Sequence, residues 1–515
     1  MGTRGQPKRS LGASLLQLPL FLLLVGVFSA AMLVPAAYGG IARDLVAARA
    51  FLYSGLLGLT AFGLIALAHA GRDPRHGTLG PLMSLLSAFV FLPILLAVPF
   101  YEGVRTTTFL NAYVEMVSAV TTTGATIFDD PERLNGTLHL WRALVGWMGG
   151  LLMWVAASAI LAPLNLGGFE VTARAEPGRK ASRDLGMTAP EVRKRIAKVG
   201  AVLIPIYTAL TVLLWILLAV GGDAGLTAIC HAMSIMATSG ISPVGGLSDA
   251  ASGMAGEAVM LLFMLFALSR LTFSTDTVTS EAGGLTRDPE FRIGLALVVI
   301  VPLVLFFRHF LGAFDVAAED ELADAWRALW GSAFTVLSFL TTTGFASANW
   351  VDAQAWSGLE TPGLLLMGLA LVGGGVATTA GGVKLLRVFA LYQNGLREME
   401  RLVHPSSVSG AGPMERRLQK GGAFIAWIFF MLFALTLALV SILLSLAGVD
   451  FDTALIIAIA GLSTTGPLLD VAADAPVHLI EMTGAAKSIF VAAMVLGRLE
   501  TLAIIALFTP DLWRG

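Results

Sequence analysis

The segment FLNAYVEMVSAVTTTGA, residues 109–125, joins a run of helix-forming residues to a hydroxyl-rich stretch that ends at Gly124 and Ala125. Its apolar part is too short to cross a bilayer, because a spanning helix needs roughly 20 apolar residues. A short helix followed by irregular backbone is typical of a re-entrant loop, which is tolerated at membrane depth only where protein or a water-filled cavity surrounds it. The segment therefore predicts irregular backbone buried inside a membrane protein.

The same pattern occurs four times along the chain. Short helices are expected at 109–120, 226–236, 326–340 and 451–462, and each is followed by small hydroxyl-bearing residues and a glycine. We name these segments the four hydroxyl–glycine stretches: Thr121-Thr122-Thr123-Gly124-Ala125, Ala237-Thr238-Ser239-Gly240-Ile241, Thr341-Thr342-Thr343-Gly344-Phe345 and Ser463-Thr464-Thr465-Gly466-Pro467. Their glycines are 116, 104 and 122 residues apart (240−124, 344−240 and 466−344). Such spacing indicates a long internal repeat of span, short helix, hydroxyl–glycine stretch and span.

The composition places the whole chain in a membrane. Hydrophobic residues make up 56% and charged residues only 13%, against about 25% charged in soluble proteins, and the mean hydropathy is +0.80. One cysteine, Cys230, excludes an intrachain disulfide. The apolar runs predict ten spans, centred on Leu11–Tyr38, Phe51–Ala70, Pro81–Pro99, Leu140–Leu161, Val199–Val220, Met254–Phe273, Ile293–Phe310, Pro362–Leu391, Ala423–Leu446 and Ala485–Leu507.

Charge asymmetry between loops predicts the orientation. Basic residues are concentrated in the loops around 72–75, 174–198, 287–292 and 397–420, and basic loops stay on the cytoplasmic side. With ten spans, both termini are then cytoplasmic, and the first span is an uncleaved helix rather than a secretory signal. The opposite loops are acidic, with Asp129, Asp130, Glu132, Asp249, Asp315, Glu319, Asp320, Glu321, Asp324, Asp352, Asp470 and Asp474. Negatively charged loops would raise the local concentration of cations. This favours a cation over an anion as the transported ion.

The hydroxyl–glycine stretches fit a selectivity filter for a monovalent cation. A ring of backbone carbonyls can replace the hydration shell of an ion. Carbonyls point inward where ordinary and left-handed dihedrals alternate, and glycine adopts the left-handed region without a steric penalty. Each short helix would also direct its partially negative C-terminus toward the ion. The predicted ion-binding residues, with potassium as the metal ion, are Thr122, Thr123, Gly124, Thr238, Ser239, Gly240, Thr342, Thr343, Gly344, Thr464, Thr465 and Gly466.

These stretches, together with further motifs, resemble the Trk/Ktr/HKT superfamily of potassium transporters, and most closely its bacterial TrkH branch. The further motifs are Gly167-Gly168-Phe169, Pro177-Gly178, Gly373-Gly374-Gly375 through Ala380-Gly381-Gly382-Val383-Lys384, Gly497-Arg498-Leu499-Glu500 and Phe508-Thr509-Pro510. The resemblance implies potassium uptake across the bacterial inner membrane, a homodimer with one pore per subunit, and no covalently bound cofactor. Gly124 favours potassium, whereas Ser239 and Ile241 depart from the Gly and Phe common in the family.

The resemblance and the repeats together define a fold class. We expect an all-α polytopic membrane protein with four pseudo-repeats around one pore and two extra N-terminal spans. The expected parts are residues 1–77 for the extension, 78–192 for the first repeat, 193–286 for the second, 287–412 for the third, which contains an intramembrane loop at 373–382, and 413–515 for the fourth.

The glycines and threonines of 373–382 make a continuous helix implausible. The resemblance implies that this segment obstructs the pore and moves during gating, and the predicted gating residues are Gly373, Gly374, Gly375, Thr378, Thr379, Gly381, Gly382, Lys384 and Arg498. Charges inside spans normally pair or line a water-filled path. Arg498 is expected to form an electrostatic barrier neutralised by Glu500, Arg387 to snorkel to the cytoplasmic interface, and Glu115 to be a structural carboxylate.

No phosphate-binding loop is visible, since Gly381-Gly382-Val383-Lys384 lacks the spacing and the trailing hydroxyl. The resemblance implies a cytosolic TrkA-like nucleotide-binding regulatory subunit docked on the basic segments 174–198 and 397–420, with membrane lipid but no nucleic acid as a further partner. Three alternatives stay open: a sodium- or proton-coupled potassium symporter, a less selective potassium/sodium conductance, and a secondary transporter of an organic solute, which would show inverted repeats. An intramembrane enzyme is disfavoured, because no nucleophile–base or metal pair lies within the spans.

Overall fold

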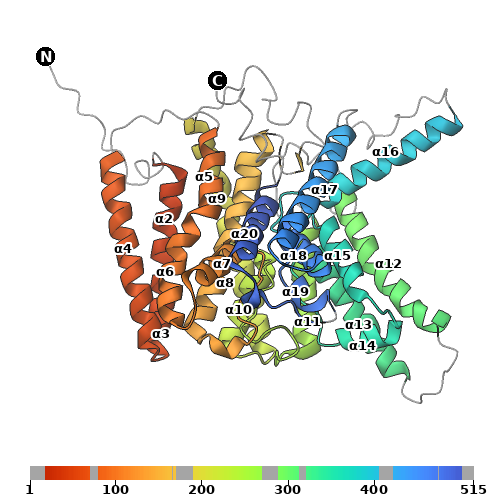
Figure 1. The fold of residues 1–515 in the computed structure, drawn as a ribbon, viewed down its shortest axis with the longest axis horizontal. Helices are drawn as coiled ribbons and strands as arrows, with labels where there is room; N and C mark the ends of the chain where they lie inside the picture. Colours follow the sequence, from red (N-terminus) through yellow and green to blue (C-terminus); the bar gives the residue numbers. More distant parts are fainter. Residues whose placement is uncertain are drawn as a thin grey trace.

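The computed structural model describes residues 18–69, 79–164, 166, 168–169, 189–269, 288–312, 321–404, 422–473 and 475–500. These parts of the chain contain helices and connecting segments but no strand. Three N-terminal helices, α2 (Leu20–Ala31), α3 (Leu33–Ile41) and α4 (Leu45–His69), lie together at one edge of the molecule (Figure 1). Ser29 and Gly58 lie where α2 and α4 approach, and a side chain at Gly58 would meet Ser29.

The first short helix lies inside a group of longer ones. Helices α5 (Leu79–Val90) and α6 (Leu92–Val104) precede α7 (Phe109–Val120), and α8 (Gly136–Ala156) follows it, extended by a π turn and a 3-10 turn to Leu164. The Thr108 hydroxyl accepts a hydrogen bond from the Asn111 N–H at 3.3 Å and so caps α7. The bounds predicted for this short helix are confirmed.

The second and third short helices follow in the same manner. Helix α9 (Ala189–Val220) leads to α10 (Gly225–Ala237) and then to α11 (Gly253–Met264), which continues as a 3-10 turn to Leu268. Helix α12 (Pro289–Gly312) leads to α13 (Glu321–Leu340), α14 (Trp350–Ser357), α15 (Pro362–Val372) and α16 (Leu385–Val403). Helix α13 has 20 residues and begins at Glu321, ahead of the predicted start at Trp326. The first turn of α13 contains Glu321 and Asp324. The helix is therefore longer than expected, but it is not apolar enough to span a membrane.

The last group repeats the order. Helix α17 (Gly422–Leu446) precedes the fourth short helix, α18 (Phe451–Ser463), and the one-turn helix α19 (Leu468–Val471) and α20 (Gly484–Leu499) follow. Asp450 caps α18 by accepting from the Thr453 N–H at 3.1 Å. Figure 1 shows α7, α10, α18 and α20 near the centre of the molecule, with α4 and α12 toward opposite edges.

The described chain has seven helices long and apolar enough to cross a membrane, or eight if the bent pair α14 and α15 is one span. These seven helices correspond to seven of the ten predicted spans; the other three predicted spans are Met254–Phe273, Pro362–Leu391 and Ala485–Leu507. The described part of the first predicted span, Leu11–Tyr38, is long and apolar enough to cross a membrane, with a turn at Met32 between α2 and α3. The predicted span Pro362–Leu391 is broken at Gly373, as its glycines predicted. The parts of Met254–Phe273 and Ala485–Leu507 that the structure describes are helical only to Leu268 and Leu499, and Arg270–Phe273 and Thr501–Leu507 lie outside it.

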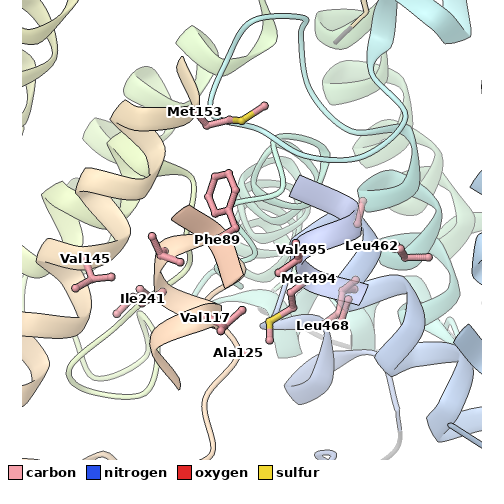
Figure 2. Packing of buried hydrophobic residues seen from close by; sticks show 14 of the residues in the cluster. Phe89, Val117, Ala125, Val145, Met153, Ile241, Leu462, Leu468, Met494 and Val495 are labelled. Carbon is pink, nitrogen blue, oxygen red and sulfur yellow. The ribbon is translucent and has the colours of Figure 1, made fainter. Parts of the chain in front are cut away.

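Hydrophobic side chains surround the C-terminal parts of the four short helices. Val117 of α7 and Ala125 after it lie near Ile241, while Leu462, Leu468, Met494 and Val495 gather on α18, α19 and α20 (Figure 2). The outer helices instead expose large apolar residues, among them Leu57, Leu64, Ile216, Val304 and Leu435. Such an arrangement suits a protein surrounded by lipid, because the exposed apolar side chains then contact lipid rather than water.

Candidate functional site

The four hydroxyl–glycine stretches have an unusual backbone. The second residue of each has a left-handed φ, +55° at Thr122, +49° at Thr238, +57° at Thr342 and +54° at Thr464. Three of the four glycines have one too, +75° at Gly124, +64° at Gly240 and +87° at Gly344. The intervening residues do not, so ordinary and left-handed dihedrals alternate as predicted. Gly466 is the exception, because its φ is not positive.

Each short helix holds the start of its stretch with the same hydrogen bond. The N–H of the residue before the glycine donates to the carbonyl six residues before the glycine; these bonds are Thr123 to Ser118 (2.8 Å), Ser239 to Ser234 (2.9 Å), Thr343 to Ser338 (2.9 Å) and Thr465 to Ala460 (2.9 Å). Hydroxyl pairs add to three of the stretches, with Oγ atoms 2.8 Å apart in Thr121–Thr123, 3.0 Å in Thr341–Thr343 and 3.1 Å in Ser463–Thr465. The backbone beyond each helix end is thus fixed locally.

The glycines bring the four stretches together. A Cβ at Gly124 would lie 1.7 Å from the Ser239 carbonyl oxygen, and one at Gly240 would lie 2.4 Å from the Thr343 oxygen. One at Gly344 would meet the Pro467 ring at 2.9 Å, and one at Gly466 would lie 2.0 Å from the Ala125 nitrogen. The Gly466 N–H also donates to the Thr123 carbonyl at 2.6 Å. The stretches therefore form a closed ring in chain order, and only glycine allows them to approach this closely.

All twelve predicted filter residues belong to this ring. The side chains of Thr122, Thr123, Thr238, Ser239, Thr342, Thr343, Thr464 and Thr465 are buried. The Oγ1 atoms of Thr122 and Thr464 are buried without a hydrogen-bond partner, whereas that of Thr342 accepts from the Gly381 N–H at 2.7 Å. The bond of Thr342 connects the third stretch to the segment between α15 and α16.

The segment between α15 and α16, residues 373–384, packs against the ring. A Cβ at Gly381 would lie 2.1 Å from the Ser463 carbonyl oxygen and 2.3 Å from Thr464 Oγ1. The Thr379 hydroxyl donates to the Met236 carbonyl at 3.4 Å. The segment thus contacts the second, third and fourth short helices or their stretches, with left-handed φ at Gly373, Ala377, Gly382 and Lys384.

The other side of this segment is anchored to its neighbours. The Gly375 N–H donates to the Ala267 carbonyl at 3.0 Å, and the Val376 N–H donates to Glu290 Oε1 at 3.2 Å. A Cβ at Gly168 would lie 2.3 Å from Val376, so this glycine of the predicted Gly-Gly-Phe motif contacts the segment as well. Thr378 and Thr379 line a small cavity together with Trp154, Met236 and Thr238.

The buried charges around this segment differ in part from the predictions. Arg498 is 3% exposed and donates through Nη1 to the Thr379 carbonyl at 2.7 Å. Glu500 forms its ion pair with Arg387, at 2.6 Å from Nη2, and the expectation that Glu500 neutralises the charge of Arg498 stays a prediction. Arg387 does not snorkel, because it is fully buried and its guanidinium lies 3.6 Å from the Phe429 ring centroid. The Lys384 ammonium donates to the Ala380 carbonyl.

Several buried polar contacts lie beyond the ring. Glu115 pairs with Arg142 at 2.6 Å, as a structural carboxylate should. Sequence reasoning missed Lys487, whose ammonium donates to Asn111 Oδ1 at 2.9 Å and to the Ile480 carbonyl at 3.0 Å. It also missed Glu257, a buried carboxylate that accepts from Trp330 Nε1 at 2.7 Å. A charge inside an apolar run was the only signal available for either residue.

A titratable cluster lies past the first and fourth stretches. His478 Nδ1 lies 3.0 Å from Asp129 Oδ2. Asp470 of α19 reaches solvent, yet enclosure by the surrounding protein, with Asp129 as the next cause, raises its pKa to about 6. Within the described chain, no group of three or more His, Cys, Asp or Glu residues could hold a metal ion.

The fold and the ring of four stretches define a polytopic α-helical membrane protein with irregular backbone converging at its centre. The chain belongs to the TrkH family of cation transport proteins, whose family model matches residues 96–514. It is 32% identical to the Trk system potassium uptake protein TrkH of Salmonella typhimurium over 96% of this chain and 98% of that protein. The TrkH protein of Escherichia coli is 31% identical with the same coverage.

A solved structure agrees with this assignment. The crystal structure of the potassium transporter TrkH from Vibrio parahaemolyticus matches 97% of this chain and 99% of its own, with a TM-score of 0.78 and 25% identity. These relatives carry the names of transport proteins rather than of enzymes. The predicted family and the predicted all-helical membrane fold are therefore confirmed.

Proposed function

We propose that this chain takes up potassium across a bacterial inner membrane through one pore, with the four hydroxyl–glycine stretches as its selectivity filter. One observation carries the proposal: four stretches, one after each short helix, converge in a closed ring, and in three of them left-handed and ordinary dihedrals alternate through the glycine. Alternation of this kind turns successive carbonyls toward a common axis, where they can replace the water around a cation. The potassium named in the relatives' descriptions supports this choice of ion.

The short helices supply the electrostatic part of the filter. Each ends at its hydroxyl–glycine stretch, and the C-terminus of a helix carries about half a negative charge. Four such ends around one point favour a cation without a formal charge that would bind it too tightly. The repeats proposed on this basis are residues 78–192, 193–286, 287–412 and 413–515, behind an extension at residues 1–77.

Residues 373–384 act as the gate. The Gly381 N–H is bonded to Thr342 of the third stretch, and Gly381 lies against Ser463 and Thr464 of the fourth. An ion that leaves the ring toward this side must displace the segment. Arg498, bonded to the Thr379 carbonyl, adds a positive charge behind it, which opposes a cation in a low-dielectric environment. The predicted gating residues Gly373, Gly374, Gly375, Thr378, Thr379, Gly381, Gly382, Lys384 and Arg498 all lie in this segment or contact it.

Regulation comes from outside the pore. A cytosolic TrkA-like nucleotide-binding subunit docks on the basic segments 174–198 and 397–420, parts of which lie outside the described residues. The subunit can open the gate only if it binds the open and closed pores with different affinity. The protein is a homodimer with both termini in the cytoplasm, and its exposed apolar helices contact lipid.

Uptake of radiotracer rubidium by potassium-starved cells that lack their own potassium transporters tests the proposal. We expect expression of the chain to restore uptake, and excess external potassium to compete more strongly than excess sodium. Equal competition by the two ions would favour the less selective conductance, a reading supported by Ser239 in the second stretch. Collapse of uptake when the sodium or proton gradient is dissipated at constant membrane potential would favour the coupled symporter. No uptake in correctly assembled protein would refute the proposal.

A further inference from the structure

The side chain nine residues before the glycine occupies an equivalent place on each short helix. These residues are Glu115, His231, Thr335 and Ile457. The first three form a hydrogen bond with the segment that leaves the hydroxyl–glycine stretch, whereas the fourth is apolar and fully buried. Three of the short helices therefore form hydrogen bonds on both sides of the glycine of their own stretch. A backbone carbonyl of the helix accepts the bond before the glycine, and a side chain of the helix makes the bond after it.

In the first stretch the contact is ionic. Glu115 is 1% exposed, and its Oε2 accepts from the Ile127 N–H at 2.9 Å and from Thr126 Oγ1 at 3.4 Å. Arg142 of α8 lies 2.6 Å from its other oxygen. A buried carboxylate with a cationic partner and a backbone donor is satisfied, so it fixes the position of Ile127 firmly.

In the second and third stretches the contacts are different but lie in the same place. His231 Nε2 lies 2.9 Å from Ser242 Oγ, two residues past Gly240. Thr335 Oγ1 accepts from the Ser347 N–H at 3.1 Å, three residues past Gly344. A second group supports the third stretch from outside its own repeat, because Glu257 of α11 accepts from the Ala348 N–H at 2.7 Å and from the Ser347 hydroxyl at 2.7 Å.

The fourth stretch shows what happens without this contact. Ile457 offers no acceptor, and Gly466 is the one glycine of the four without a left-handed φ. Its N–H bonds across the ring to the Thr123 carbonyl, and Leu468 starts α19 directly after Pro467. The three stretches held at both ends share the alternating backbone through their glycine, and the one held only before the glycine does not.

We propose that Glu115, His231 and Thr335, with Glu257 behind the third stretch, are positioning residues that set the discrimination between potassium and sodium. The inference rests on the proposed filter. A ring of carbonyls discriminates between ions by the positions of its oxygen atoms. In a stretch that is hydrogen-bonded to its helix only before the glycine, these oxygen atoms can move. Removal of the Glu115 carboxylate or the Thr335 hydroxyl also leaves a buried backbone N–H without its acceptor, which the backbone can relieve only by moving.

Thr335→Val tests this with a near-isosteric change that removes the acceptor of the Ser347 N–H. Reversal potentials in proteoliposomes give the potassium/sodium permeability ratio. We expect this ratio to fall about fivefold, the size expected from the loss of one intramolecular hydrogen bond, and Thr335→Ser to restore it. Ile457→Val, at the same place on α18, is the matched control and should leave the ratio unchanged.

Two further variants separate the possible failures. Gly124→Ser tests the filter itself, because it alters the ring directly. If Gly124→Ser changes the ratio while Thr335→Val leaves it at the wild-type value, the positioning role is wrong and the filter stands; if neither changes it, the filter assignment fails as well. If Thr335→Val does not assemble, as judged by size-exclusion chromatography, Glu257→Gln takes its place in the test. Both carboxylate oxygens of Glu257 accept hydrogen bonds, whereas the glutamine amide has only one acceptor oxygen. An unchanged ratio in Glu257→Gln would equally overturn the proposal.

Discussion

Replacement of Gly124 by Ser is the sharpest test of the ring. The φ of +75° costs a residue with a Cβ about 1–2 kcal/mol. The added Cβ would also lie 1.7 Å from the Ser239 carbonyl oxygen, whereas real Cβ atoms stay at least 3.0 Å from such a neighbour. The two backbones must therefore separate by about 1.3 Å (3.0−1.7). Both effects fall on carbonyls that are proposed to bind the ion.

We expect the potassium/sodium permeability ratio to fall about tenfold in Gly124→Ser, since about 1.4 kcal/mol of lost discrimination corresponds to one order of magnitude. Gly344→Ser should lower the ratio less than Gly124→Ser does, because the added Cβ would meet only the Pro467 ring, at 2.9 Å. Reversal potentials in proteoliposomes under mixed potassium and sodium gradients measure both. Gly368→Ala on α15 is the control, since nothing lies within 4 Å of its added Cβ.

A wild-type ratio in Gly124→Ser, measured on protein that elutes as the native assembly, would refute the reasoning. So would an equal loss in Gly368→Ala, because it would show that any added methyl group disturbs the protein. A larger loss in Gly344→Ser than in Gly124→Ser would contradict the geometric argument while leaving the filter intact.

Three other predictions follow from the same geometry. Deletion of Thr378–Gly381 should raise basal rubidium flux severalfold without the regulatory subunit, because it removes the Gly381–Thr342 bond; unchanged flux in assembled protein would count against a gate. Asp470 is ionised above its pKa of about 6, so uptake at low potassium should rise as external pH increases through 6, and Asp470→Asn should flatten this profile; a profile identical to wild type would exclude Asp470 as its origin. Reversal of Arg416, Arg417 and Lys420 to Glu, in a segment outside the described residues, should weaken binding of the nucleotide-binding subunit in pull-down assays while the ion preference stays unchanged; wild-type binding and nucleotide response would exclude docking there.

The sequence alone determined the local part of the fold. The bounds of α7 were predicted from the sequence, and those of α10 and α18 differ from the prediction by one residue at most ends. The reason is that the length of an apolar run and the hydroxyl–glycine stretch after it are both local signals. The left-handed dihedrals of Gly124, Gly240 and Gly344 could be predicted for the same reason. The break at Gly373 was equally visible, because clustered glycines disfavour a helix wherever they occur.

Only the tertiary structure decided which distant groups meet. Glu500 and Arg387 are 113 residues apart and form an ion pair that sequence reasoning did not predict. Lys487 reaches Asn111 across 376 residues. Burial selects these pairs, since a charge removed from water takes whichever partner the packing of helices provides. Gly466 shows the same limit in the backbone. Its stretch has the same hydroxyl–glycine pattern, but Pro467 follows the glycine and restricts the backbone of the residue before it. The Gly466 N–H also bonds to Thr123 across the ring, a contact that its own residues do not predict.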